Sequence, residues 1–482
     1  MNVLKSMSEH EWISRAKTFF LAIIAEIDLT LLNLVNIFCV TRFLGADGAA
    51  AYEVVMPCMM IVAAVIALGY NGVQAVCAKD YGAGDFTAFE RHKNAGYTWL
   101  TVIVAAFTLL FALFKVPILD LLGAYDGNAD MARLSEECYS STLFFYLPQS
   151  IFSLAACFMF LENRWHLLVT NLILYVCMLA GNIIVALTRP SMMGFMAVNA
   201  ISLVAADIYI ILYCMFGRNG SRVAFTAFNM RWRDIRETFF TGLPDFMEYG
   251  FVGVLYLIQN RYVLSRFSQS IMAGISVFEA IDNLPEILCV GFCFLVTDTF
   301  GKKVGRVIGA SSDGDQESAK KELGEAIRQI TFEGVAGALF VAAALLLLAR
   351  PMVGLFLPSG DAIAADSAVM LTVSCAIGFV FYMLNSELVC YYKVVEAYIP
   401  AHILFFAEAL LFPLGFKLML GELFGVTGFC LGAGVGEIAT FLLNLCIVWR
   451  MAGRFPRKIS DFRLDKYLQK TLKKQRNSEI RL

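Results

Sequence analysis

Long apolar stretches separated by short polar segments run through almost the whole chain. Each stretch has the length of about 20 residues that a helix needs to cross the ~30 Å hydrocarbon core of a bilayer. The expected spanning segments are residues 18–42, 50–76, 95–117, 140–161, 166–188, 193–217, 240–265, 271–298, 328–350, 367–392, 399–420 and 424–449. The pattern predicts an all-α polytopic membrane protein with about twelve transmembrane helices.

The composition agrees with a membrane protein. Hydrophobic residues make up 59% of the 482 residues and charged residues 16%, against about 25% charged residues in a soluble chain. The net charge of −2 gives no sign of a nucleic-acid partner. The 13 cysteines and four histidines form neither a CxxC pair nor a cluster with metal-ligand spacing. We therefore expect no metal site and no cofactor.

The charges of the connecting segments predict the orientation. Basic residues concentrate in residues 77–94, 218–237 and 299–328 and in the tail at 456–482, whereas residues 118–139 are acidic. Cytoplasmic connections carry an excess of Lys and Arg. We expect a multi-pass protein of the cell (plasma or inner) membrane with both termini in the cytoplasm, and the even number of spans agrees.

The chain also repeats itself. NIFCVTRF at 36–43 is similar to NRYVLSRF at 260–267, and PILDLLGA at 117–124 is similar to PMVGLFLP at 351–358. A repeat of six helices gives both halves the same orientation in the membrane. The sequence therefore predicts two pseudo-symmetric six-helix lobes related as a parallel repeat. We place them at residues 1–225 and 226–455, followed by a basic cytoplasmic tail at 456–482.

Three carboxylates lie on one expected face of the eighth span. Glu279, Asp282 and Glu286 are spaced i, i+3 and i+7. Each carboxylate at the centre of a bilayer costs about 2.5–3.5 kcal/mol, so such a stripe is expected where it lines a wet cavity or an ion path. We interpret the three residues as an ion-coupling or cation-binding site. The alternative is a polar network that holds the helix against its neighbours.

Further acidic and polar residues within the spans complete the list of candidates. Asp245 and Glu248 at i, i+3 are a second ion-coupling pair. The expected lining of a substrate cavity comprises Asn33, Asn36, Asn260, Tyr249, Tyr256, Tyr382, Glu387, Glu408 and Glu437. The tyrosines are candidates to stack on an aromatic cation. The asparagines Asn36 and Asn260 occupy matching repeat positions, which also suits structural hydrogen bonding. Basic partners are few, chiefly Lys393 and Lys417 near the ends of their spans.

Four sequence segments carry a resemblance to a known family. They are LGADGAAAYEVVMP at 44–57, ALGYNGVQAVCAKDYGAGDF at 67–86, GLPDF at 242–246 and FGVTGFCLGAGVGE at 424–437. Together they resemble multidrug and toxic compound extrusion (MATE) transporters over residues 16–450. The resemblance implies two six-helix lobes around a central cavity and multidrug efflux, the export of cationic or amphipathic xenobiotics in exchange for H⁺ or Na⁺.

One position departs from the family pattern. Many members carry an Asp in the first helix where this chain has Asn36, and an amide cannot exchange a proton. Glu26 forms a rough stripe with Asn33 and Asn36 and is a candidate substitute. The coupling site can also lie in the other lobe.

The sequence favours a secondary active antiporter but leaves alternatives open. A lipid or glycolipid flippase of similar architecture would line its cavity with basic residues to hold phosphate, whereas the expected cavity is acidic. A non-transporting membrane protein is the other alternative, since Asn36 replaces a titratable residue. No HExxH, Ser/His or clustered Asp motif supports an enzyme. We expect a monomer whose partners are small cationic or amphipathic molecules and membrane lipids. The substrate and the choice between H⁺ and Na⁺ stay open.

Overall fold

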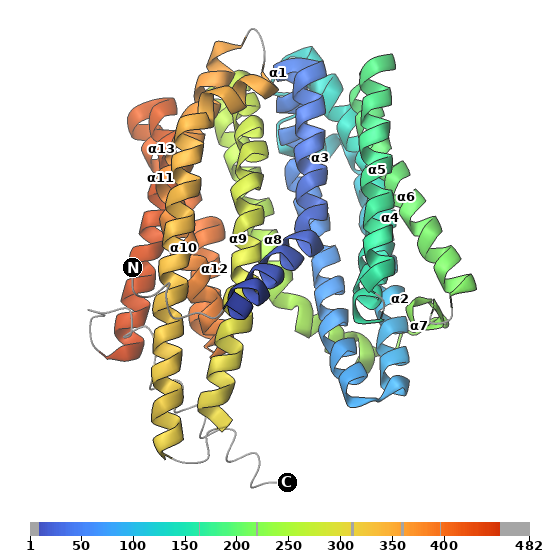
Figure 1. Ribbon diagram of the computed structural model, residues 1–482. Coiled ribbons are helices and arrows are strands. Elements are labelled where there is room, and N and C mark those ends of the chain that lie inside the picture. The colour runs from blue at the N-terminus through green and yellow to red at the C-terminus, as the bar shows by residue number, and fades with distance from the viewer. Residues whose placement is uncertain are drawn as a thin grey trace. The chain divides into compact units, whose positions relative to one another are not determined.

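The computed structural model describes residues 9–162, 164–217, 220–309, 313–357, 361–395 and 397–453, and in this part every regular element is a helix (Figure 1). The helices are α1 (Glu9–Ala83), α2 (Phe86–Leu113), α3 (Lys115–Leu122), α4 (Ala129–Glu162), α5 (Arg164–Thr188), α6 (Met192–Phe216), α7 (Gly220–Val223), α8 (Trp232–Arg266), α9 (Gln269–Gly309), α10 (Asp313–Phe356), α11 (Ala362–Val394), α12 (Tyr398–Phe406), the π-helix η1 (Ala407–Leu411) and α13 (Phe412–Ala452).

Two of these helices are broken by a glycine. Gly45 in α1 has φ 73° and ψ −160°, and Gly425 in α13 has φ 64° and ψ −146°. This region of backbone space is open almost only to glycine, because a Cβ atom would clash with the backbone. Each glycine therefore reverses or redirects the chain between two apolar segments that the sequence analysis separates.

The number of spanning helices agrees with the expectation of about twelve. Nine helical segments of the described residues are long and apolar enough to cross a membrane. The break at Gly45 divides the whole of α1 into residues 9–44 and 46–83, and the break at Gly425 divides the last segment into residues 399–424 and 426–452. The α8 helix is not among the nine segments, but its 35 residues are long enough for a further span after its charged first turns. Residues described here thus form the all-helical polytopic membrane protein that the apolar pattern predicts.

The chain forms two compact units, which are described separately. Unit 1 contains residues 1–30, 281–352 and 369–482, and unit 2 contains residues 31–280 and 353–368. The α9 helix passes from unit 2 into unit 1 after Ala280. The predicted lobes at 1–225 and 226–455 remain a prediction, and the tail at 456–482 lies outside the described residues.

In unit 2, α6 packs against both α4 and α5, and α4 packs against α2 (Figure 1). The closest helix crossing joins α1 to α8 through two glycines. A Cβ atom on Gly72 would lie 2.0 Å from the Thr238 carbonyl oxygen, and one on Gly242 would lie 1.9 Å from the Leu68 carbonyl oxygen. Both glycines belong to segments that carry the family resemblance, so those segments serve this close approach of two backbones.

The connecting segments of unit 2 separate to two ends. At one end, Asn94 donates to the Thr226 hydroxyl at 2.9 Å and the Tyr97 hydroxyl donates to the Val223 carbonyl at 3.1 Å, which ties the linker before α8 to the start of α2. At the other end, Arg261 donates to Asp126 at 2.6 Å. The basic segments 77–94 and 218–237 therefore share one end of unit 2, away from the acidic segment 118–139.

In unit 1, small residues bring α11 and α13 together. The Ser374 hydroxyl donates to the Leu431 carbonyl at 3.1 Å and accepts from the Gly434 amide at 3.0 Å. A Cβ atom on Gly378 would lie 2.9 Å from the Gly434 Cα atom. The apolar core beside this contact draws on α9, α10 and α11, with Phe292, Phe300 and Tyr391 among its buried members.

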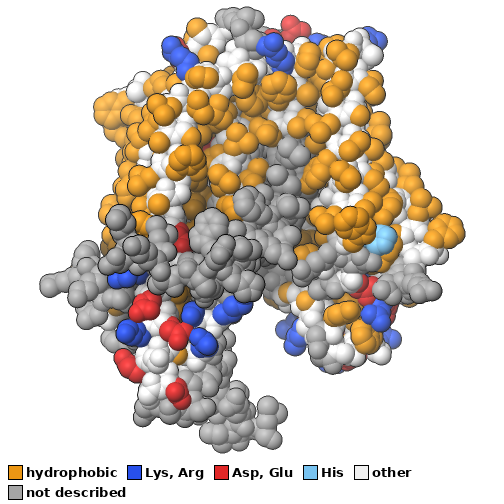
Figure 2. Space-filling view, viewed as in Figure 1, with side chains coloured by type: hydrophobic (Ala, Val, Ile, Leu, Met, Phe, Trp, Pro, Cys, Tyr) orange, Lys and Arg blue, Asp and Glu red, His pale blue; other side chains and the backbone are white. Residues whose placement is uncertain are grey.

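The outer surfaces of the helices are apolar. Leu187 on α5, Phe216 on α6 and Leu347 on α10 are each 79–80% exposed. Figure 2 shows hydrophobic side chains along the length of the helices and Lys, Arg, Asp and Glu side chains gathered near helix ends. A surface of this kind suits contact with lipid tails in the middle and with water at the ends.

Candidate functional site

A buried polar cluster lies in unit 2, where both halves of α1 meet α8. The Tyr52 hydroxyl donates to the Asn33 side-chain oxygen at 2.8 Å and lies close to the Asn36 side chain. From α8, the Asn260 side-chain amide donates to the Glu53 backbone carbonyl at 2.8 Å. We call these five residues the unit 2 polar cluster. It gathers three of the predicted candidates, Asn33, Asn36 and Asn260, around Tyr52 and Glu53.

Glu53 is the titratable carboxylic acid of this cluster. Its exposed fraction is 0%, and that of Asn36 is 1%. A carboxyl group shielded from water within a spanning helix must be protonated, paired with a cation or hydrogen-bonded to polar neighbours. Asn36, at the position where many family members carry an Asp, cannot exchange a proton. Glu53, on the same helix and next in the chain to Tyr52, can provide the acid chemistry that Asn36 lacks.

The three predicted carboxylates of α9 have different surroundings. Glu279 lies in unit 2 and accepts a hydrogen bond from the Tyr256 hydroxyl on α8. Asp282 lies in unit 1 and accepts from the Cys375 thiol on α11 at 3.0 Å. Glu286 is exposed. The three carboxylates therefore have the expected spacing along one helix. The boundary between the two units falls after Ala280, between Glu279 and Asp282, and these two carboxylates have different hydrogen-bond partners.

A second polar cluster lies in unit 1 and contains two acids and one lysine. Lys417 and Glu437 on α13 and Asp282 on α9 are close enough for their charges to act on one another. Asn385 on α11 donates to the Glu437 backbone carbonyl at 3.4 Å. Asp282, Cys375, Asn385, Lys417 and Glu437 form what we call the unit 1 polar cluster.

Lys417, which the sequence analysis places near the end of a span, is buried in the structure. The Lys417 side chain is 7% exposed, and its Nζ atom lies 6.0 Å from the centroid of the Phe429 ring. Its charge partly compensates those of Asp282 and Glu437. Lys417 therefore offsets part of the negative charge of the unit 1 acids, for which the sequence analysis expects few basic partners.

The remaining candidates of unit 1 lie outside this cluster. Glu387 on α11 is 4% exposed and accepts from the Thr331 hydroxyl on α10 at 2.7 Å. The charges of Glu286 and Glu408 act on the Tyr382 hydroxyl, and Glu408 lies in the π-helix η1. Short π-helical segments occur often at functional sites. Tyr382 thus lies within electrostatic range of two carboxylates, which also suits an organic cation.

Four predicted candidates add no geometry to either cluster. The side chains of Glu26, Asp245 and Glu248 lie outside the described residues, although their backbones belong to α1 and α8. Tyr249 on α8 is 37% exposed. Their proposed roles in ion coupling and substrate contact stay predictions.

The sequence analysis did not select two acids that are buried within apolar runs of unit 2. Glu53 is one, and the other is Asp207 on α6, which is 8% exposed and whose Oδ1 atom has no hydrogen-bond partner among the described residues. Both residues are isolated acids in apolar runs, AAYEVVMP and LVAADIYI. The criterion that selected the acids of the C-terminal half, applied equally to the N-terminal half, would have found them.

The chemistry available in both clusters is binding of protons or small cations. Carboxylates, amide oxygens and tyrosine hydroxyls provide oxygen ligands and exchangeable protons. Within the described ranges, no group of three or more His, Cys, Asp or Glu side chains is arranged to hold a metal ion.

Outside the spans, burial raises the pKa of Glu162, and this effect is opposed by Arg222 at 3.2 Å.

Comparison with known proteins confirms the resemblance. Residues 22–187 match the MatE family model. A MATE family multidrug resistance transporter of the MOP superfamily in an inward-facing conformation superimposes with a TM-score of 0.77 at 16% identity, covering 93% of this chain and 99% of that one.

Two further solved structures are similar. A Vibrio cholerae MATE transporter in the bent form has a TM-score of 0.63 at 14% identity, covering 95% of this chain and 98% of that one. A MOP superfamily transporter from Pyrococcus furiosus, described as having a binding pocket of reverse polarity, has a TM-score of 0.67 at 15% identity, covering 90% and 94%. No curated protein matches in sequence. The chain therefore has the fold of MATE family transporters.

Proposed function

We propose that this multi-pass membrane protein with the MATE transporter fold is a secondary active exporter of cationic or amphipathic small molecules, driven by inward flow of H⁺ or Na⁺. The observation that carries the proposal is the complete burial of Glu53, which follows Tyr52 in α1 and whose backbone carbonyl accepts from Asn260. An ionisable residue inside a membrane span is costly, and such residues usually serve ion or substrate pathways.

Protonation of a buried carboxyl supplies the driving event. When the carboxylate takes up a proton or a cation, the cost of keeping a charge in the span falls, and the packing of neighbouring helices can change. In unit 2 the affected contact joins α1 to α8 through Asn260 and the backbone at Glu53. A change at Glu53 would thereby alter the two-state equilibrium that alternating access requires.

The acids of unit 1 support a preference for positively charged substrates. Glu387 and Glu437 lie within spans, and Tyr382 lies beside Glu286 and Glu408. Carboxylates and tyrosine rings both attract organic cations. A flippase that holds a phosphorylated lipid would need basic groups in these places. Lys417 is the buried lysine near two of the acids, and its charge is opposed by both.

A counterflow assay tests the direction and charge of transport. Proteoliposomes preloaded with an unlabelled organic cation should accumulate the labelled cation from outside, whereas those preloaded with an organic anion of similar size should not. Proteoliposomes without protein control for leakage. Exchange of a pyrophosphoryl lipid with no exchange of organic cations would support the flippase and contradict this proposal.

We further propose that both termini are cytoplasmic in the cell membrane and that the protein acts as a monomer. The basic segments 77–94 and 218–237, which share one end of unit 2, support this orientation.

A further inference from the structure

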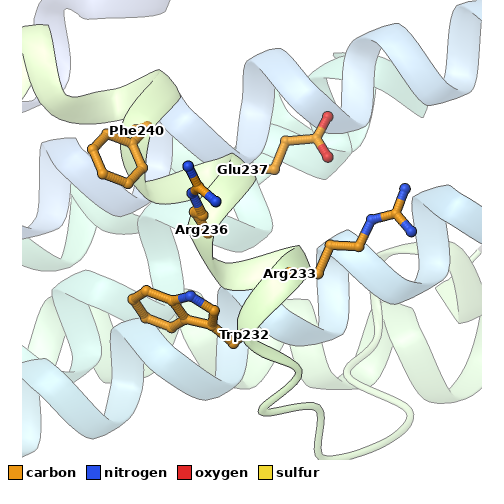
Figure 3. Close-up of a pocket in the computed structure, with 5 residues that line it drawn as sticks. All are labelled: Trp232, Arg233, Arg236, Glu237 and Phe240. Atoms are coloured by element: carbon orange, nitrogen blue, oxygen red, sulfur yellow. The ribbon is translucent and has the colours of Figure 1, made fainter.

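The start of α8 carries an exposed stripe of aromatic and arginine side chains that the transport proposal does not use. Trp232, Arg236 and Phe240 are spaced i, i+4 and i+8, which places them on one helix face. Trp232 is 71% exposed and Phe240 is 58% exposed. The Arg236 guanidinium lies 5.8 Å from the centroid of the Phe240 ring, and Figure 3 shows it between Phe240 and Trp232.

These side chains line an open groove of about 530 Å³ together with Arg233 and Glu237 (Figure 3). The opposite face of the same turns is buried: Asp234 is 2% and Thr238 is 0% exposed. The Trp99 indole donates to the Thr238 hydroxyl at 3.2 Å. The helix is therefore fixed to α2, and the groove faces away from unit 2.

The groove carries positive charge that no acid within the described ranges neutralises. Arg231, Arg233 and Arg236 form no ion pair there. Glu237 is the acid that lines the groove, and its Oε2 atom lies 3.7 Å from the His92 Nε2 atom. An anion bound to the arginines would therefore meet little competition from neighbouring side chains.

The stripe lies between the charged end of unit 2 and its apolar part. The preceding linker is tied to the charged start of α2 by the contacts of Asn94 and Tyr97, and α8 continues beyond Phe240 as a spanning helix. Aromatic residues gather at the level of lipid headgroups, and basic residues there attract anionic lipids.

We propose that this groove binds an anionic phospholipid of the leaflet that it faces, with the phosphate at Arg233 and Arg236 and the acyl chain along Trp232 and Phe240. A zwitterionic lipid brings its own cation to the site and gains less from the arginines. A soluble anion gains nothing from the two aromatic rings. The pairing of arginines with exposed aromatics on one face therefore favours an anionic lipid over both.

Fluorescence quenching by brominated lipids tests the site. The full-length protein is reconstituted in bilayers of phosphatidylglycerol and phosphatidylcholine. In one set the phosphatidylglycerol is brominated, and in the other set the same mole fraction of phosphatidylcholine is brominated. The Trp232 signal is the difference between wild type and Trp232→Phe. We expect phosphatidylglycerol to quench it at a lower mole fraction, and we expect Arg233→Gln and Arg236→Gln each to reduce this preference about fivefold.

Arg133→Gln is the matched control, because Arg133 is an exposed arginine of unit 2 at the end that carries segment 118–139. It should leave the preference unchanged. Equal quenching by both lipids in the wild type would overturn the proposal. So would an unchanged preference in the Arg233→Gln, Arg236→Gln double variant. Loss of the preference on addition of glycerol phosphate in solution would assign the groove to a soluble anion and equally reject a lipid.

Discussion

The side-chain amide of Asn260 on α8 donates a 2.8 Å hydrogen bond to the backbone carbonyl of Glu53 on α1, across 207 residues of sequence. Asn260 is 0% exposed, so the bond is shielded from water. It fixes α8 beside a fully buried acid of unit 2. This bond connects Asn260, to which the repeat assigns a structural role, with the residue for which we propose ion coupling.

The glycine break in α13 gives the first prediction. Gly425→Ala should destabilise the protein by about 1–3 kcal/mol, because an alanine at φ 64° and ψ −146° is strained. Gly415→Ala in the same helix is the control, since nothing lies within 4 Å of an added Cβ atom there and its backbone is helical. Thermal unfolding in detergent should show a lower midpoint for Gly425→Ala alone. Equal midpoints would show that the break carries no strain cost.

The crossing of α1 and α8 gives the second prediction. Gly242→Ala should separate the two helices and lower stability by several kcal/mol, because its Cβ atom would lie 1.9 Å from the Leu68 carbonyl oxygen. Gly250→Ala, also on α8, should be tolerated, since its closest neighbour would be 4.0 Å away. Expression level and monodispersity in detergent measure the difference. Normal behaviour of Gly242→Ala would mean that the helices do not approach so closely.

The sequence allowed the helices to be predicted better than their connections. Runs of apolar residues mark spans because side chains that face lipid are apolar and because a helix satisfies its own backbone hydrogen bonds. Both requirements are local in the sequence. The breaks at Gly45 and Gly425 depend on unusual backbone angles, and a glycine in LGADG or FGVTG does not reveal its φ. A continuous helix and a reversal at glycine share the same residue pattern.

The candidate site was predictable in its residue types but not in its partners. The spacing of Glu279 and Asp282 follows from helix geometry, whereas their hydrogen bonds to Tyr256 and Cys375 depend on which helices pack together. Burial of Glu53 likewise depends on coverage by distant segments, which include the helix that carries Asn260. An acid in an apolar run can be seen in the sequence, but its surroundings are set by tertiary packing.

The acids of α9 give a third prediction. Asp282→Asn should impair transport more strongly than Glu286→Gln, because Asp282 interacts with Cys375, Lys417 and Glu437 whereas Glu286 is exposed. The amides keep the shape of the side chain but remove its charge. Initial rates of cation efflux at equal protein content measure the order. A larger loss for Glu286→Gln would place the functional acid of this helix at its exposed position.

The orientation of unit 2 gives a fourth prediction. A cysteine at Thr87, in the basic segment 77–94, should be protected from a membrane-impermeant maleimide in intact cells, and one at Asp130, in segment 118–139, should react. Both positions are exposed in the structure, so accessibility within the protein is matched. The parent protein corrects for its native cysteines. Labelling at Thr87 and protection at Asp130 would invert the proposed topology.

The proposed role of Glu53 gives the fifth prediction. Glu53→Gln should keep the fold, because the amide has nearly the same shape and leaves the backbone carbonyl bonded to Asn260. It should lose the export that a gradient drives, because the side chain no longer takes up a proton or a cation. Each coupled proton contributes about 1.4 kcal/mol per pH unit, or about tenfold in the substrate ratio that the protein can sustain. Glu137→Gln, at a half-buried position near the start of α4 where the carboxylate pairs with Arg133, is the control.

The most direct measurement is efflux of an organic cation from proteoliposomes in which a pH gradient and a Na⁺ gradient are imposed separately. For the wild type and Glu137→Gln, we predict that one of the two gradients accelerates efflux and raises the final substrate ratio. For Glu53→Gln, we predict facilitated exchange that neither gradient accelerates. Gradient-driven efflux by Glu53→Gln equal to that of the wild type would contradict coupling at this buried acid.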